Sequence, residues 1–196
     1  TTESWNLGMN KIIDNAKKAG DTLGGVFEVV VTGAVKGLGS HIQWDTRLDA
    51  KIAAALMSIQ AIKGVEVGEG FEYANLPGSK AHDEMFLTEN KNYMRKTNHA
   101  GGIEGGMSNG EEIVVRAVMK PIPTLMRPLA SVDIESKNEV SANTERSDVC
   151  AVSAASVVGE AMVAIALVEV LLEKFANDNM ADLLASIKQY QERIGW

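Results

Sequence analysis

Apolar residues along this chain fall into runs with recognisable periods. Residues 9–18 carry apolar side chains at helical spacing and end in two lysines before Gly20, which predicts a helix with a basic last turn. The β-branched run within residues 24–32 predicts a strand, and the glycines after it predict a turn into a second short strand. Residues 48–62 are apolar on nearly every side, so we expect a helix buried between two layers and stopped by Gly64.

The second half of the chain carries the clearest hairpin pattern. Residues 94–107 and 111–120 predict two paired strands, because Ser108, Asn109 and Gly110 between them tolerate the positive φ of a tight turn. The other expected elements are a strand at 65–67, a turn and short helix at 68–76, a polar loop at 78–92, a strand at 131–135, a polar loop at 136–145, a long apolar helix at 154–175 and an amphipathic helix at 180–194.

Composition narrows the class of partner. The 196 residues are 45% hydrophobic and 23% charged, the mix of an ordinary globular protein, and the length fits one domain or two small ones. The formal net charge of −7 argues against nucleic acid or an anionic membrane as a partner, because both select a basic face. The single cysteine, Cys150, excludes an intrachain disulfide framework and favours a reducing compartment, which we expect to be the cytoplasm.

Two segments bear on targeting. Residues 1–5 have neither an initiator Met nor a signal pattern, so they predict a cut edge and not a natural start. The apolar run at 149–166 approaches membrane-spanning length, but Glu160 lies inside it and Glu169 just beyond. We therefore expect a helix buried inside protein.

Four glycines occupy six positions, at Gly101, Gly102, Gly105 and Gly106. An ordered glycine loses more backbone entropy than any other residue and brings no side chain to the core, so packing alone rarely demands such a cluster. We expect these glycines to form a cradle for a large flat or anionic ligand. His99 borders the cradle.

The remaining chemistry-bearing side chains give no metal pattern. His41, His82 and His99 show no metal-ligand or catalytic-triad spacing, and one cysteine cannot build a thiolate site. We expect no metal site. His82 and Asp83 lie in a polar stretch and are predicted to face solvent.

The segment Lys120-Pro121-Ile122-Pro123-Thr124 is predicted to be extended and stiff. Its two prolines fix φ on either side of the isoleucine and remove two amide donors. An ammonium and a hydroxyl held at its two ends suit a phosphate or a flavin carbonyl. The structural alternative is an edge strand leaving a sheet, which prolines also favour.

Arg146-Ser147-Asp148 stands where the chain passes from a polar loop into the long apolar helix. An arginine beside an aspartate can bind an anion while the carboxylate manages a proton. The structural alternative is a helix cap, because an aspartate near a helix N-terminus stabilises the free amides and the dipole.

Together these segments resemble the chorismate synthase family, the last enzymes of the shikimate pathway. Several motifs in the right order and spacing are far more specific than a lone glycine pattern. The matching stretches are residues 39–45, 58–66, 98–110, 120–124 and 145–151.

The resemblance implies an α+β fold, a β-α-β sandwich in which helices are layered between antiparallel sheets, with this chain forming the C-terminal half. It implies conversion of 5-enolpyruvylshikimate 3-phosphate to chorismate by 1,4-anti elimination of phosphate and a ring hydrogen. Reduced FMN is the implied cofactor, NADPH is a candidate reductant of that flavin, and relatives assemble as homotetramers.

The resemblance also carries family residues onto this chain. Asp148 corresponds to the family's acidic residue near flavin N5, and Arg146 would serve flavin and substrate phosphate alike. Gln60 is a departure, because many relatives carry Asn there. The implied FMN contacts are Gln60, Ala61, Gly105, Lys120, Pro121, Ile122, Pro123, Thr124 and Arg146.

A larger departure is the absence of any counterpart to the family's N-terminal half, which supplies two histidine acids and most phosphate-binding arginines. We therefore regard residues 1–196 as the C-terminal portion of one domain and expect no chorismate formation by it alone. The alternatives are a non-catalytic FMN-binding or oligomerisation module, and an unrelated phosphate-binding domain that uses the same glycine motif.

Overall fold

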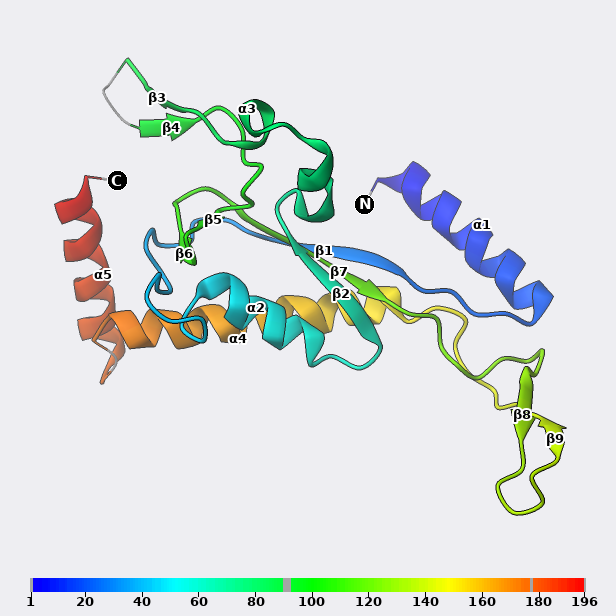
Figure 1. Cartoon of the computed structure of the whole chain (residues 1–196). Coiled ribbons are helices and arrows are strands. Elements are labelled where there is room, and N and C mark those ends of the chain that lie inside the picture. Colours follow the sequence, from blue (N-terminus) through cyan, green and yellow to red (C-terminus); the bar gives the residue numbers. More distant parts are fainter. Residues whose placement is uncertain (1, 90–92, 177, 196) are drawn as a thin grey trace.

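A three-stranded antiparallel sheet lies at the centre of the molecule. The computed structural model describes residues 2–89, 93–176 and 178–195. The strand order is β1 (Gly25–Val31), β7 (Ile113–Met119) and β2 (Ile62–Val67), so that β7 pairs with both neighbours. Helix α2 (Leu48–Met57) connects β1 to β2, and β7 lies between these two strands, which makes a split β-α-β unit (Figure 1).

The core forms where α2 and α4 (Val152–Lys174) pack against one face of this sheet. Alternate residues of β1 and β7 face inward, as the two-residue period of a strand requires, and meet Leu48, Ile52 and Leu56 of α2, which are fully buried. Gly159 of α4 allows close approach, since a Cβ there would lie 2.4 Å from the Phe27 ring. The buried residues thus join both helices and the sheet in one cluster.

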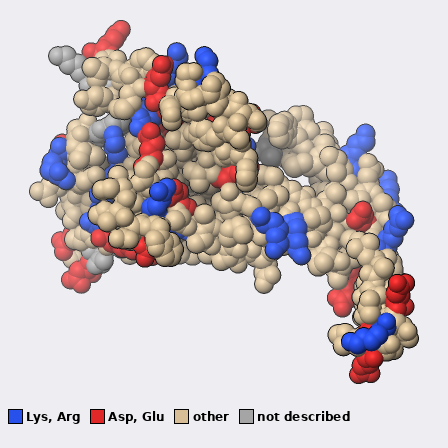
Figure 2. All heavy atoms as spheres, viewed as in Figure 1, with Lys and Arg blue, Asp and Glu red and all other residues tan. Residues whose placement is uncertain are grey.

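Other elements lie around this core. Helix α1 (Glu3–Ala19) has no buried residue. It projects, with the hairpin of β8 (Ala130–Val132) and β9 (Glu139–Ser141), from the end of the sheet opposite α5 (Met180–Ile194) (Figure 1). Acidic and basic side chains are interspersed on the face that Figure 2 shows. The remaining elements are η1 (Gly70–Asn75), α3 (Gly78–Ala81), β3 (Met85–Leu87), β4 (Tyr93–Arg95), β5 (Ile103–Glu104) and β6 (Met107–Ser108).

The predicted α+β class with antiparallel pairing is confirmed, but the predicted hairpin at 94–120 is wrong. Residues 113–119 form the central strand β7, while 103–104 and 107–108 make their own short hairpin and 93–95 pair with 85–87. The β-branched run of β7 is buried at alternate positions and pairs with β1 and β2, so long-range burial outweighs the local turn signal.

Several predicted boundaries also shift. The buried helix ends at Met57, and Gly64 lies inside strand β2 instead of stopping a helix. The polar loop predicted at 78–92 contains α3 and β3, and its end at 90–92 lies outside the described residues. The second short strand expected after residue 32 is reduced to a single bridge between Gly39 and Met107.

The long apolar helices are covered on one side within the described chain. In α4 the buried residues follow a single stripe through Ala155, Gly159, Val163, Ala166 and Val170. On its other faces Val157, Ile165 and Val168 are more than half exposed. By length and composition α4 could cross a membrane, and 28% of its most apolar 18-residue window is buried here. The expected burial of this helix inside protein is therefore met, within the described chain, only on the face toward the sheet.

Candidate functional site

The stiff segment 120–124 continues directly from β7, the central strand of the sheet, so its interpretation as a departing edge strand is wrong. The Lys120 N–H donates to the Ala61 carbonyl at 2.9 Å. This hydrogen bond holds Gln60 and Ala61 beside Lys120. Ala61 has a φ of 68°, a left-handed conformation that is uncommon for a residue with a Cβ and that costs about 1–2 kcal/mol.

The middle of the segment is anchored on the chain that leads into β1. The Thr22 hydroxyl, which is buried, donates to the Ile122 carbonyl at 2.6 Å. A Cβ on Gly24 would lie 2.2 Å from the Met119 carbonyl oxygen, so only glycine allows this close approach. Pro121 and Pro123 are exposed between these anchors. The backbone of the segment is thus fixed while one side of it stays open.

A second hydrogen bond brings in the segment before α4. The Ser147 hydroxyl donates to the Thr124 carbonyl at 3.1 Å, which holds Arg146 and Asp148 next to the far end of the stiff segment. Helix α4 begins at Val152 with Ala151 at the N-cap position and no side-chain cap bond, so the interpretation of Asp148 as the helix cap is wrong. Arg146 and Asp148 are both exposed and form no ion pair with another described residue.

Three segments that are far apart in sequence therefore meet at one end of the sheet, around residues 60–61, 120–124 and 146–148. The polar groups offered there are an ammonium, a guanidinium, a hydroxyl, an amide and one carboxylate. Two permanent or near-permanent cations suit a phosphate, and the amide and hydroxyl suit ring carbonyls. The donor set fits the phosphate-bearing flavin that the family resemblance implies.

The predicted glycine cradle is largely a packing feature. A Cβ on Gly101 would lie 2.3 Å from the Gly68 nitrogen, and one on Gly102 would lie 2.4 Å from the Glu112 carbonyl oxygen. Gly106 is crowded in the same way by the Ser40 carbonyl. Close approach of two backbones explains why glycine is needed at these three positions, without a ligand.

Gly105 differs from the other three. It is exposed, has a φ of 59°, and a Cβ on it would meet nothing within 4 Å. It lies in the turn between β5 and β6, at the end of β7 opposite Lys120. With a rise of about 3.3 Å per residue, the seven residues of β7 separate these two ends by roughly 20 Å. The structure brings the other site residues together but not Gly105.

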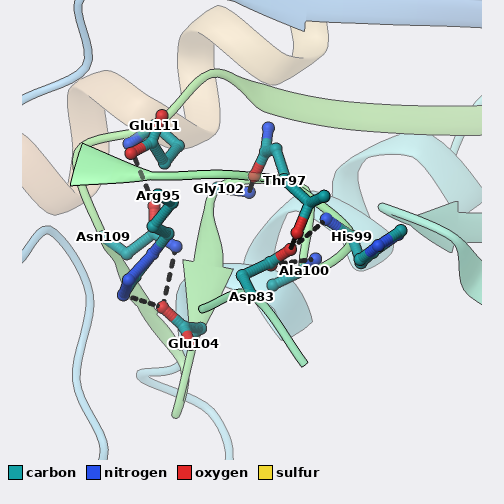
Figure 3. Close-up of polar contacts among 10 residues, drawn as sticks. Asp83, Arg95, Thr97, His99, Ala100, Gly102, Glu104, Asn109 and Glu111 are labelled. Atoms are coloured by element: carbon teal, nitrogen blue, oxygen red, sulfur yellow. Dashed lines mark hydrogen bonds and ion pairs between the residues drawn. The ribbon is translucent and has the colours of Figure 1, made fainter. Parts of the chain in front are cut away.

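The sequence interpretation missed a polar network around the glycine loop (Figure 3). Asp83 was predicted to face solvent, yet its carboxylate accepts hydrogen bonds from the Thr97 hydroxyl at 2.6 Å and from the N–H groups of His99 and Ala100 at 2.8 and 2.9 Å. Burial alone raises the pKa of Asp83, but these hydrogen bonds outweigh it and leave the pKa below its ordinary value.

His99 is drawn into the same network and not into a ligand cradle. Its Nδ1 lies 3.0 Å from the Glu69 carboxylate, and its carbonyl accepts the Glu69 N–H at 2.9 Å. The one sequence signal for this network is an aspartate followed at a distance by a loop rich in glycine and asparagine, whose amides need acceptors. No group of three or more metal-ligating side chains is found among the described residues.

Comparison with known proteins decides the family. The family model for chorismate synthase matches residues 2–172. This chain belongs to the chorismate synthase family. The chorismate synthase of Geobacter metallireducens is 57% identical over 193 residues, covering 95% of this chain and 49% of the relative, and that of Alkaliphilus metalliredigens is 58% identical over 178 residues, covering 91% and 47%.

A crystal structure of chorismate synthase is similar with a TM-score of 0.79 and 47% identity, over 95% of this chain and 48% of that one. The family resemblance and fold class drawn from the sequence are thereby confirmed. The chain spans about half the length of the chorismate synthases it matches. Helix α5 lies beyond the residues that the family model matches.

Proposed function

We propose that this chain forms the flavin-holding half of a chorismate synthase, which eliminates phosphate and a ring hydrogen from 5-enolpyruvylshikimate 3-phosphate in the 1,4-anti sense. One observation carries the proposal beyond family membership. Two hydrogen bonds, from Lys120 to Ala61 and from Ser147 to Thr124, gather three separate segments whose exposed side chains suit a phosphate-bearing flavin.

The proposed roles follow from the side-chain chemistry. Reduced FMN, when bound, would lend electron density to the substrate as the phosphate leaves and regain it as the ring hydrogen is lost, so that no net redox change results. Lys120 and Arg146 bind phosphate oxygens, and the guanidinium of Arg146 can contact flavin and substrate together because it is planar and always charged. Gln60 and Thr124 donate to ring or chain oxygens. Pro121, Ile122 and Pro123 present an extended backbone edge with few amides, against which a flat ring can lie.

Asp148 is the proposed proton carrier. An exposed carboxylate next to Arg146 can hold the ring hydrogen of the substrate as a proton on one of its oxygens and release it to water. Gly105 is the one proposed contact at the opposite end of β7, so its contribution has to be tested separately from that of the other residues.

Because the chain spans about half of its relatives, the proposal assigns it part of the active site. We regard it as the C-terminal portion of the domain and expect no chorismate formation by these residues alone. We further propose a cytoplasmic homotetramer with NADPH as the reductant of its flavin.

The test is an anaerobic assay of phosphate release from 5-enolpyruvylshikimate 3-phosphate by the full-length protein with reduced FMN. We expect turnover in the wild type and a loss of at least about tenfold in kcat/KM for Asp148→Asn, with FMN affinity retained. Wild-type activity in Asp148→Asn would contradict the proposed role of Asp148 as the proton carrier. Absence of any turnover by the full-length protein would contradict the enzyme assignment.

A second candidate is a non-catalytic FMN-binding or oligomerisation module. The observation in its favour is the open apolar surface of α1 and α4, where Trp5, Leu7, Val157 and Ile165 are all more than half exposed. FMN binding without phosphate release in the assay above would favour this candidate.

A further inference from the structure

Gly105 stands in a turn that is fixed on both sides by interactions of its neighbours. Strands β5 and β6 pair at Glu104 and Met107, so Gly105 and Gly106 are the two central residues of the hairpin. Both have positive φ, 59° and 82°, as a type I′ hairpin turn requires. Gly105 N–H donates to no other described residue, and the residue is exposed.

On one side of Gly105 the carboxylate of Glu104 is held by two donors (Figure 3). The Arg95 guanidinium forms an ion pair with it, and the Asn109 amide donates to the same oxygen at 2.8 Å. The two donors are far more buried than the carboxylate, with side-chain exposure of 11% for Arg95 against 44% for Glu104. The Glu104 carboxylate is therefore held against two buried donor side chains.

Asn109 also connects these donor side chains to the rest of the glycine loop. Its N–H donates to the Gly102 carbonyl at 2.9 Å, and its side-chain oxygen accepts the Glu111 N–H at 3.0 Å. On the other side of Gly105, the Gly106 carbonyl accepts the N–H of Leu48, the first residue of α2, at 2.8 Å. The turn is thus attached to the loop through Glu104 and to the core through Gly106.

Arg95 is the least expected member of this set. It comes from β4, outside the glycine loop, and its Nε is buried without a hydrogen-bond partner among the described residues. Burial and then the charge of Arg95 lower the pKa of the Lys36 ammonium, while Glu104 raises it. Two cations, Arg95 and Lys36, thus lie near two carboxylates, those of Glu104 and Glu111. Because Arg95 and Asn109 share the Glu104 carboxylate, the gain that this arrangement offers is a unique geometry of the loop.

We infer that Arg95 is a positioning residue, which acts through the Glu104 carboxylate to hold the Gly105 backbone where FMN contacts it. The inference rests on the proposed function, because the flavin contact of Gly105 is part of that proposal. The proposed role of Arg95 is indirect, since its side chain is largely buried against Glu104. Without the charge of Arg95, Glu104 keeps only the Asn109 amide as a donor, so the turn is held less firmly on that side.

The experiment measures the FMN dissociation constant and the thermal midpoint of the full-length protein for a set of variants. We expect Arg95→Met to raise the dissociation constant about tenfold, the effect of losing one charge-assisted hydrogen bond, and Arg95→Lys to recover most of it. Glu104→Gln, at a more exposed position, is the second variant and is expected to act in the same direction if Arg95→Met does not fold.

Lys51→Met is the matched control. Lys51 is buried to a similar degree, with 14% side-chain exposure, and it also forms ion pairs, with Glu169 and Glu173 of α4. It has no contact with Glu104 or Gly105 among the interactions described. We expect Lys51→Met to lower the thermal midpoint and to leave FMN affinity unchanged, whereas Arg95→Met changes affinity.

Gly105→Asn separates this inference from the proposed function, since Asn tolerates positive φ and adds a side chain at the contact. A raised dissociation constant in Gly105→Asn with no change in Arg95→Met and Glu104→Gln would overturn the positioning role alone. Unchanged affinity in Gly105→Asn would overturn the flavin contact of Gly105 and the positioning role together.

Discussion

At the N-terminal end of β7, next to the glycine loop (the glycine end), backbone segments pack tightly against one another. At the C-terminal end of β7, next to Pro121 and Pro123 (the proline end), polar side chains are open to solvent. Gly101, Gly102 and Gly106 are each pressed against other backbone, and Asp83 satisfies the amides around them. At the other end Lys120 and Arg146 are exposed on a backbone that is held by a few long-range hydrogen bonds. The cluster of glycines therefore reflects close packing of the backbone, whereas the exposed charged side chains on a fixed backbone mark the candidate site.

The largest expected effect on stability comes from a substitution at the glycine end. Gly102→Ala places a Cβ 2.4 Å from the Glu112 carbonyl oxygen at a φ of 76°. Backbone strain and overpacking together should lower the free energy of unfolding by about 4 kcal/mol, as measured by urea denaturation. Gly105→Ala is the matched control, with positive φ but open space, and should cost about 1–2 kcal/mol. Equal losses in the two variants would remove the distinction between the packed and the open glycine.

The next effect concerns the proline end. Lys120→Met keeps the side-chain length and removes the charge at an exposed position, so the unfolding free energy should change by less than about 0.5 kcal/mol. FMN affinity should fall by about tenfold or more, because a charge-assisted contact to phosphate is lost. Fluorescence titration with FMN measures it, and Lys188→Met on α5 is the control. A destabilised protein with normal affinity would reverse the roles assigned to the two ends.

A smaller effect sharpens the contribution of Asp83 to the glycine end. Because its pKa lies below its ordinary value in the folded protein, the carboxylate stabilises the fold above about pH 5, and this stabilisation is lost as the pH falls through the folded pKa. Asp83→Asn should cost about 1 kcal/mol at pH 7 and less at low pH. Urea unfolding at several pH values measures this difference, and a cost independent of pH would exclude the carboxylate charge as its source.

The smallest effect concerns Ala61. Its left-handed φ of 68° costs about 1–2 kcal/mol, and glycine would relieve most of that cost at an entropic penalty of about 0.5–1 kcal/mol. Ala61→Gly should therefore raise the free energy of unfolding by about 0.5 kcal/mol, measured by urea denaturation against Ala54→Gly inside α2, which should lower it. A destabilised Ala61→Gly variant would show that the left-handed conformation carries no strain.

The sequence predicted the elements whose pattern is local and missed those set by distant partners. Strand β1 and helices α4 and α5 were anticipated because their runs are long and periodic. The pairing of β7 was not, since a turn at 108–110 suggests a hairpin, whereas the partners of β7 lie at 25–31 and 62–67. Only packing in three dimensions selects those partners.

The candidate site was likewise predicted only in part. Its proline and arginine segments were recognised from their residues and from family resemblance, and the structure joins them through a hydrogen bond from the Ser147 hydroxyl to the Thr124 carbonyl that no spacing rule gives. The roles of Asp83 and Arg95 depend on side chains that meet loop amides and a carboxylate from separate elements. The glycines were recognised as unusual but were assigned to a ligand, because a sequence does not show which backbone approaches them.

The most direct test of the central claim is amide hydrogen exchange of the full-length protein with and without bound FMN. The account predicts that FMN slows exchange at Ala61, Ile122 and the amides of 146–148, while Gly101 and Gly102, already closed by packing, change little. FMN-dependent protection at Gly101 and Gly102 without protection at 122 and 146–148 would contradict it, and would return the glycine loop to the role of the ligand cradle.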